Sequence, residues 1–428
     1  METETEKRAI SYAPAIALTV SLFFLWGVAN NLNDILIAQF KKAFVLSDFG
    51  TSFVQQVFYL GYFLLAIPAS FVMRAKGYKA AIVTGLLLYG VGALLFYPAA
   101  AASQYTLFLL ALFVIASGLA FLETSANPLM TELGDPAGAA RRINWAQAAN
   151  PLGALTGIWI GRNFILSGIH HDEAALAAMG EAQRLEYYRV ETLAVQGPYL
   201  LLGLIVLGFA IAAMLIRFPA GETFAQDETK GRRFSEIFGK PRLLFAAVAQ
   251  FFYVGAQVGI WSYTIRYAQQ NAGLGEKAAA DMLFASLVLF AVGRFAGTAL
   301  MSRISPAVLL AVFAAASLVL TGIAGIVGGE TGLYALVAAS FFMSIQFPTI
   351  FALGVEGLGP LRKWGSSLIV MAIIGGAALT GLMGWTSDKT SMTTAMLVPA
   401  AAFAAIFAFA WHCRKAGPDA GVQASGAR

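Results

Sequence analysis

Residues 13–40 have the sequence APAIALTVSLFFLWGVANNLNDILIAQF, an apolar stretch that contains three asparagines and one aspartate. About twenty apolar residues suffice to cross the hydrocarbon core of a bilayer, so the stretch predicts a membrane-spanning helix. An ionisable group inside such a helix costs about 2.5–3.5 kcal/mol on insertion scales, and it usually faces a bundle interior or a wet cavity. Asp34 is therefore the first candidate for a residue on an ion or substrate path.

The composition of the whole chain supports a membrane protein. Of its 428 residues, 59% are hydrophobic and 12% are charged, and the mean hydropathy is +0.72. A water-soluble domain of this length would not be so apolar. We predict an all-α membrane protein with about twelve spans, at roughly 35 residues for each span and loop. The predicted spans are residues 13–40, 50–73, 78–98, 104–133, 142–167, 195–217, 242–270, 278–302, 306–328, 331–357, 363–386 and 392–413.

The Lys and Arg residues favour one side of the predicted membrane. With the N-terminus in the cytoplasm, 19 of the 28 fall in cytoplasmic segments and 7 in external ones, which leaves Arg162 and Arg294 inside spans. By the positive-inside rule we expect both termini in the cytoplasm and the protein in a bacterial-type inner membrane. The acidic start METETE and the long first apolar run argue against a cleavable signal peptide. We expect the basic loops to set topology rather than to bind nucleic acid.

Polar segments divide the chain. Residues 218–241, which include DETKGRR at 227–233, predict a cytoplasmic linker between an N-terminal six-helix half (1–217) and a C-terminal six-helix half with a short tail (242–428). Residues 168–196 predict an external loop with short helical pieces.

The two halves share short matches in the same order along the chain. FFLWG at 23–27 corresponds to FFYVG at 251–255, and ALTG at 154–157 recurs at 378–381. Two six-span halves in parallel, pseudo-two-fold repeat are the design of alternating-access transporters, whose substrate binds between the halves near the midplane.

Two carboxylates are expected deep in the spans, both in the N-terminal half. Asp34 belongs to the first span and Glu123 to the fourth, whereas the repeat places the neutral Gln346 where Glu123 stands. A carboxylate in a low-dielectric site can bind and release a proton as its access to water changes. We predict that Asp34 and Glu123 couple proton movement to transport; the alternative is that each is a structural hydrogen-bond acceptor.

Amide and indole side chains accompany these carboxylates. Asn30 is four residues from both Trp26 and Asp34, so the three share a helix face, whereas Asn31 points away on an ideal helix. Planar amides that bond adjacent hydroxyls, beside an aromatic ring for the apolar side of a pyranose, are typical of neutral-sugar sites. Core packing is the alternative for the aromatics. The residue pattern predicts substrate binding by Trp26, Asn30, Gln147, Asn150, Gln257, Trp261 and Gln346.

Arg294 is the remaining charge expected deep in a span. It lies between Gly293 and Gly297, in a context that suits close helix packing. We predict a gating or structural role for it, with contact to substrate or a counter-ion as the alternative.

The sequence lacks the residue patterns that several other functional classes require. The single Cys413 and the three histidines, which lie in or beside loops, predict neither a disulfide framework nor a metal site. The sequence shows no paired nucleophile and base that would predict an enzyme. We expect no cofactor beyond a coupling proton, a small neutral sugar and the lipid bilayer as partners, no nucleic acid, and a monomer.

Several motifs resemble those of the L-fucose:proton symporter family within the major facilitator superfamily, from Phe23 to about Trp411. They are LW at 25–26 with NNLND at 30–34, LET at 122–124 with NP at 127–128, Asn144 with AQ at 146–147 and Asn150, YVGAQ at 253–257, WSY at 261–263 with IRY at 265–267, and MSIQ at 343–346 with PTIF at 348–351. Residues 74–79 also resemble a cytoplasmic loop signature of the superfamily, without its acidic residue.

The resemblance implies the twelve-helix fold, proton-driven sugar uptake, Asp34 and Glu123 as the essential carboxylates, and Trp26, Asn31, Gln147 and Asn150 near the sugar. One departure is Phe347, where a related symporter has a tyrosine. We therefore predict a proton-coupled symporter that imports L-fucose, or a closely similar hexose, by alternating access. Proton- or sodium-coupled transport of glucose, galactose or N-acetylglucosamine, and a sugar-binding membrane sensor, remain alternatives.

Overall fold

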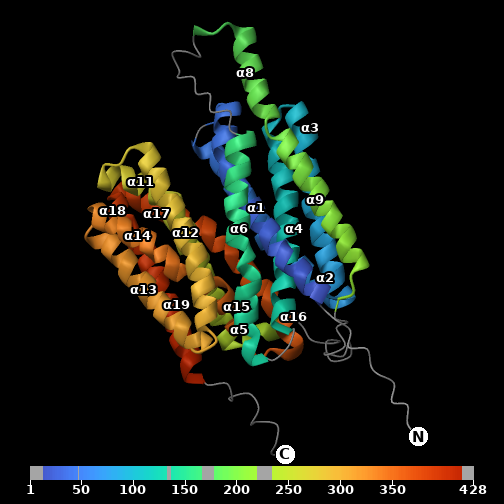
Figure 1. The fold of residues 1–428 in the computed structure, drawn as a ribbon, viewed down its shortest axis with the longest axis vertical. Helices are drawn as coiled ribbons and strands as arrows, with labels where there is room; N and C mark the ends of the chain where they lie inside the picture. The colour runs from blue at the N-terminus through green and yellow to red at the C-terminus, as the bar shows by residue number, and fades with distance from the viewer. Residues whose placement is uncertain (1–12, 47, 133–135, 166–177, 219–233, 417–428) are drawn as a thin grey trace, which may run out of the picture.

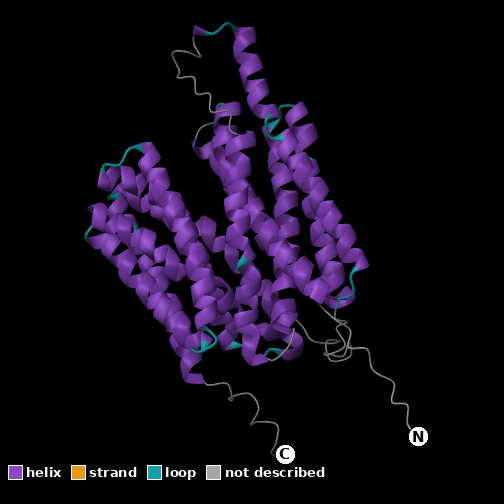
Figure 2. Ribbon diagram, viewed as in Figure 1, coloured by secondary structure: helices purple, strands orange, loops and turns teal. Residues whose placement is uncertain are grey.

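The computed structural model describes residues 13–46, 48–132, 136–165, 178–218 and 234–416. These ranges form helices joined by loops and contain no strand (Figure 2). Ten apolar helical stretches are long enough to cross a membrane. One holds two spans, because α2 (Asp48–Leu94) is kinked at Gly77, where φ is 82°. A further span is divided into α5 (Ala139–Gln147), α6 (Ala149–Ile160) and a π-helical turn, Gly161–Ile165. The described chain thus has the twelve predicted spans.

The helices gather into two groups (Figure 1). The N-terminal group contains α1 (Ala13–Ala43), α2, α3 (Phe96–Ala101), α4 (Tyr105–Glu132), α5, α6 and α9 (Gln196–Leu215), with α8 (Glu181–Leu193) extending beyond it. The C-terminal group contains α11 (Pro241–Ala272), α12 (Glu276–Leu300), α13 (Pro306–Ile326), α14 (Gly329–Met343), α15 (Gln346–Val355), α16 (Arg362–Met371), α17 (Gly375–Lys389), α18 (Met392–Ala395) and α19 (Leu397–Ala416). Of the predicted linker, residues 219–233 lie outside the described residues, and Phe234–Gly239 form a 3-10 helix.

Two spans are broken next to a proline. Pro151, the third residue of α6, has no N–H to donate to the carbonyl of Gln147, where α5 ends. Pro348 in α15 likewise leaves the carbonyl of Ser344 without its helical donor, and α14 ends just before it. The breaks separate the short helices α5 and α15 from the remainder of their spans.

Glycines let two helix pairs approach closely. A Cβ added at Gly153 on α6 would overlap the carbonyl oxygen of Phe24 on α1. The C-terminal group repeats the arrangement, because a Cβ at Gly375 would overlap the carbonyl oxygen of Phe251 on α11. These crossings bring the backbones of α1 and α6, and of α11 and α17, into direct contact.

The two groups converge at one end of the molecule and diverge at the other (Figure 1). Where they converge, α16 packs on α2 and α4, and α15 packs on α5. Helix α1 begins and α19 ends toward this side. We call the side at which α5, α15 and α16 meet the N-terminal group the closed end.

Candidate functional site

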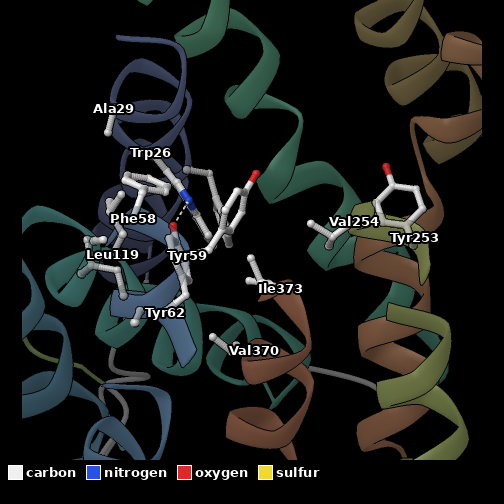
Figure 3. Packing of buried hydrophobic residues seen from close by; sticks show 14 of the residues in the cluster. Trp26, Ala29, Phe58, Tyr59, Tyr62, Leu119, Tyr253, Val254, Val370 and Ile373 are labelled. Atoms are coloured by element: carbon white, nitrogen blue, oxygen red, sulfur yellow. Dashed lines mark hydrogen bonds between the residues drawn. The ribbon is translucent and has the colours of Figure 1, made fainter. Parts of the chain in front are cut away.

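Trp26 lies on α1 in the packed region that faces the C-terminal group (Figure 3). Its indole N–H donates to the hydroxyl of Tyr62 at 2.7 Å, its ring stacks on Phe23, and 7% of its surface is exposed. The side chain of Tyr59 extends to the C-terminal group and lies against Gly376 on α17. Because the indole N–H is already bonded, Trp26 can offer its ring face to a sugar. Sequence reasoning missed Tyr62, which no spacing distinguishes from the other tyrosines of its span.

The amides of α1 differ in their bonding. The Nδ2 of Asn31 donates to the Gly27 carbonyl at 3.0 Å within the helix. The buried Oδ1 of Asn30 has no hydrogen-bond partner among the described residues. Asp34 belongs to α1, but its side chain lies outside the described residues. The acceptor oxygen of Asn30 is therefore available to another molecule.

Glu123 is enclosed by protein on α4. It is 1% exposed, and its Oε2 makes no hydrogen bond with a described residue. Helix α4 is buried on all sides from Ile115 to Thr131, so the carboxylate cannot turn toward lipid or bulk water. Burial without a hydrogen-bond donor disfavours the ionised form of a carboxyl group. This environment suits a group that takes up a proton.

A chain of hydrogen bonds crosses between the groups beside Glu123. Asn127 lies one turn further along α4, and its Oδ1 accepts from the Nε2 of Gln147 at 2.9 Å. The Oε1 of the same Gln147 accepts from Nη1 of Arg294, on α12 of the C-terminal group, at 3.1 Å. The structure thus brings Gln147 and Arg294 together, although they come from different halves of the sequence. Asn127, four residues from Glu123, was not among the predicted site residues.

Asn150 closes the N-terminal part of the candidate site. Its Nδ2 donates to the carbonyl of Phe23 at 3.2 Å, which ties α6 to α1 close to Trp26. The bond depends on the close crossing at Gly153, because a wider separation would move this amide away from α1.

Trp261 is the corresponding indole of the C-terminal group. Its Nε1–H donates to the Ser340 hydroxyl at 3.2 Å, and its ring meets the edge of Phe290 with centroids 5.0 Å apart. Gln257 lies one turn earlier on α11 and is partly buried.

Gln346, at the start of α15, is fully buried. Its Nε2 donates to the Ser317 hydroxyl and to the Phe342 carbonyl, both at 3.0 Å, and its Oε1 has no partner among the described residues. The structure therefore ties the amide nitrogen of Gln346 into its own group, and only the oxygen is left unbonded.

Polar contacts join the two groups at the closed end. Glu132 of α4 accepts a hydrogen bond from the Tyr78 hydroxyl at 2.6 Å and pairs with Arg362 of α16 at 3.3 Å. The Ser70 hydroxyl donates to the carbonyl of Lys363 at 2.7 Å. Because Arg362 and Lys363 belong to the C-terminal group, the Glu132–Arg362 and Ser70–Lys363 contacts must break if the groups separate here.

Two further contacts reinforce this end. The Nδ2 of Asn144 on α5 donates to the Thr349 hydroxyl on α15 at 3.1 Å. The guanidinium of Arg74 lies 4.5 Å from the ring centroid of Trp364, a cation–π distance. Within the described residues, no group of three or more His, Cys, Asp and Glu is placed to hold a metal.

Comparison with known proteins identifies close relatives. The chain is 46% identical over 407 residues to the L-fucose-proton symporter of Escherichia coli K12, a match that covers 94% of this chain and 93% of that one. It is 35% identical over 411 residues to a glucose/galactose transporter of Brucella abortus, with 95% of each chain covered.

Solved structures of similar proteins have the same fold as this chain. A crystal structure of the major facilitator transporter FucP in the outward conformation matches with a TM-score of 0.86 and 45% identity, over 94% of this chain and 99% of that one. The proton:xylose symporter XylE, at 12% identity, has the same fold, with a TM-score of 0.69 over 93% of this chain and 95% of that one. The sequence model of the Major Facilitator Superfamily matches residues 15–363. The chain belongs to the major facilitator superfamily.

Proposed function

We propose that this protein is a proton-coupled symporter that imports L-fucose by alternating access. The observation that carries the proposal is the enclosed Glu123, whose Oε2 is unbonded, one turn from the Asn127–Gln147 amide pair. The carboxyl would take up the coupling proton, with Asp34 as its partner, and no cofactor would be needed. The names of the E. coli relative and of a second L-fucose-proton symporter, from Haemophilus influenzae and 34% identical, support the sugar.

The sugar would lie between the two groups. Gln147, Asn150, Asn30 and Asn31 would bond its hydroxyls, and the rings of Trp26 and Trp261 would cover its apolar faces. Gln257 and Gln346 would complete the site from the C-terminal group. Glucose or galactose is the second candidate, favoured by the Brucella relative and by Phe347, whose ring packs on Tyr253 and offers no hydroxyl.

We further propose the orientation of the protein in an inner membrane. The unequal distribution of Lys and Arg would place the closed end in the cytoplasm. The likeness to FucP in the outward conformation supports the same state for this structure. Residues 1–217 and 242–428 would rock as two bodies joined by the linker at 218–241, each protein molecule acting as a monomer.

Proton movement provides the test of this function. In a de-energised, unbuffered suspension of cells or proteoliposomes, L-fucose is expected to raise the external pH, because each sugar would carry a proton inward. Galactose, glucose and N-acetylglucosamine are tested in the same way. Alkalinisation by another sugar alone would retain the mechanism and overturn the substrate. No signal with any of the four sugars, in protein shown to be folded, would contradict proton symport.

The ion pair at the closed end should set the balance between conformations. Replacing Glu132 by Gln removes the charge that pairs with Arg362, which should cost about 1 kcal/mol and shift the balance toward the inward-open state about fivefold. The measurement is maleimide labelling, from the cytoplasmic side, of Met73→Cys in a Cys413→Ser background. Met73 is fully buried here.

Glu356→Gln is the matched control for this substitution. Glu356 pairs with Arg242 inside the C-terminal group, so its loss should not change the labelling rate. Equal rates in both variants would show that the pair between Glu132 and Arg362 does not hold the closed end.

A further inference from the structure

Arg294 is a cation enclosed by neutral groups. Its side chain is 3% exposed and forms no ion pair with a described residue. Nη1 donates to Oε1 of Gln147, the guanidinium carbon lies 5.1 Å from the ring centroid of Phe290, and the buried Nε has no hydrogen-bond partner among the described residues. A buried cation is costly unless its contacts compensate for lost hydration. The bond to Gln147 is the one hydrogen bond that its side chain makes with a described residue.

The Gln147 amide is held at both ends. Its Nε2 donates to Asn127 and its Oε1 accepts from Arg294, so the two ends of the amide cannot exchange places. An amide carries two N–H donors and two acceptor lone pairs. One N–H and one lone pair therefore remain, in a fixed orientation, for a pair of hydroxyls on a ligand. Without Arg294, no described residue would donate to this oxygen.

The two restraints come from different groups of helices. Asn127 and Gln147 both belong to the N-terminal group, whereas Arg294 belongs to α12, which touches α5 and α6. The Asn127 bond therefore persists when the groups separate near α5, and the Arg294 bond does not. Phe290, against which Arg294 packs, also contacts Trp261, so this ring links the arginine to the indole on the other side of the proposed sugar site.

We propose that Arg294 is a positioning residue that fixes the Gln147 amide for sugar binding only while the two groups touch at the closed end. The inference rests on the proposed function. The outward-facing site then binds the sugar more tightly than the inward-facing site, where the Gln147 amide is held by Asn127 alone and its oxygen is no longer restrained. Binding and conformation are linked, so the sugar shifts the equilibrium toward the outward-facing state. The size of the shift equals the ratio of the two states' affinities for the sugar. Loss of the Arg294 bond thus assists release into the cytoplasm.

The test measures L-fucose binding to protein locked in the outward-facing state. Met73→Cys and Lys363→Cys are joined by a flexible bis-maleimide in a Cys413→Ser background, because Nζ of Lys363 lies 3.4 Å from the Met73 carbonyl oxygen. In this locked protein, Arg294→Met should weaken L-fucose binding about tenfold by titration calorimetry, as expected for a lost bond to a charged donor. Arg294→Lys, which keeps the charge, should weaken binding less and serves if Arg294→Met does not fold.

Two comparisons separate positioning from simple attachment of the groups. Thr349→Val removes another bond between α5 and α15 without touching Gln147, so it should leave binding to the locked protein unchanged. In a Gln147→Ala background, Arg294→Met should cause no further loss, because the residue through which it acts is gone. At the cytoplasmic face, in inside-out vesicles, Arg294→Met should leave the half-saturating L-fucose concentration unchanged within twofold.

The outcomes distinguish the two levels of the argument. The positioning role would be overturned if Arg294→Met and Thr349→Val lowered the affinity for L-fucose equally. It would also be overturned if Arg294→Met lowered that affinity by its full factor in the Gln147→Ala background. Neither result would contradict the transport function. A locked protein of otherwise wild-type sequence that binds no L-fucose would overturn the proposed substrate, and the positioning role for that sugar with it.

Discussion

Glu123→Gln is expected to abolish proton-driven accumulation of L-fucose while exchange of preloaded sugar continues. A membrane potential of about 100 mV and one pH unit supply about 2.3 and 1.4 kcal/mol per proton, enough for roughly 500-fold accumulation. The substitution removes the proton site but keeps the side chain's shape, and the fully buried Gln346 shows that the C-terminal group accommodates such an amide at the position matched by the repeat. The measurement is uptake of labelled L-fucose in energised vesicles, compared with counterflow in de-energised ones.

The control for this prediction is another acidic residue. Glu330, in the first turn of α14, is exposed, so Glu330→Gln should accumulate sugar as the wild type does. Undiminished accumulation by Glu123→Gln would rule out a proton role for this carboxyl, and loss of counterflow together with accumulation would indicate that it binds sugar instead.

Gly153→Ala should prevent most of the protein from assembling. The added methyl group overlaps the carbonyl oxygen of Phe24, a backbone atom that no side-chain rotation can move aside. Overpacking of this kind costs about 3 kcal/mol or more, which should lower the yield of folded transporter severalfold. Gly375→Ala, at the corresponding crossing of α11 and α17, should behave alike. Size-exclusion profiles of detergent-extracted protein measure both.

Gly208→Ala is the matched control for these crossings. Gly208 lies exposed on α9, where a Cβ would meet nothing within 4 Å. Alanine there should be neutral or stabilise the helix by about 0.5–1 kcal/mol. A Gly153→Ala variant that folds as well as Gly208→Ala would show that α1 and α6 can move apart without loss.

Hydropathy predicts most of this fold because lipid imposes long apolar helices. The span predicted at 104–133 is α4 (Tyr105–Glu132), and that predicted at 195–217 contains α9 (Gln196–Leu215). The fifth span begins at Ala139 rather than at the predicted residue 142, so Arg141 and Arg142 lie in the first turn of α5. Hydropathy alone could not reveal that the helix extends back to Ala139, because the start of α5 is polar.

The site was harder to predict than the fold. The sequence identified Trp26 by its spacing from Asn30 on one helix face, and Glu123 as a carboxylate deep in an apolar span, because a single span shows its own polar residues. The partner of Arg294 could not be predicted, since Gln147 is 147 residues away and the bond depends on how two groups of helices meet. The same holds for Tyr62, which is identified by its bond to Trp26.

The broken spans have a mechanical consequence for this transporter. Helices α5, α15 and α16, which carry most of the contacts at the closed end, have 9, 10 and 10 residues, and each is separated by a break from the remainder of its span. Such breaks act as joints, because bending there disrupts fewer helical hydrogen bonds than bending a continuous helix. The helices that continue two of these spans, α6 and α17, pack instead on α1 and α11 at the glycine crossings. The closed end therefore consists of three short helices that can each bend at a break in its span, and one of them can lose its contacts while the longer helices stay in place.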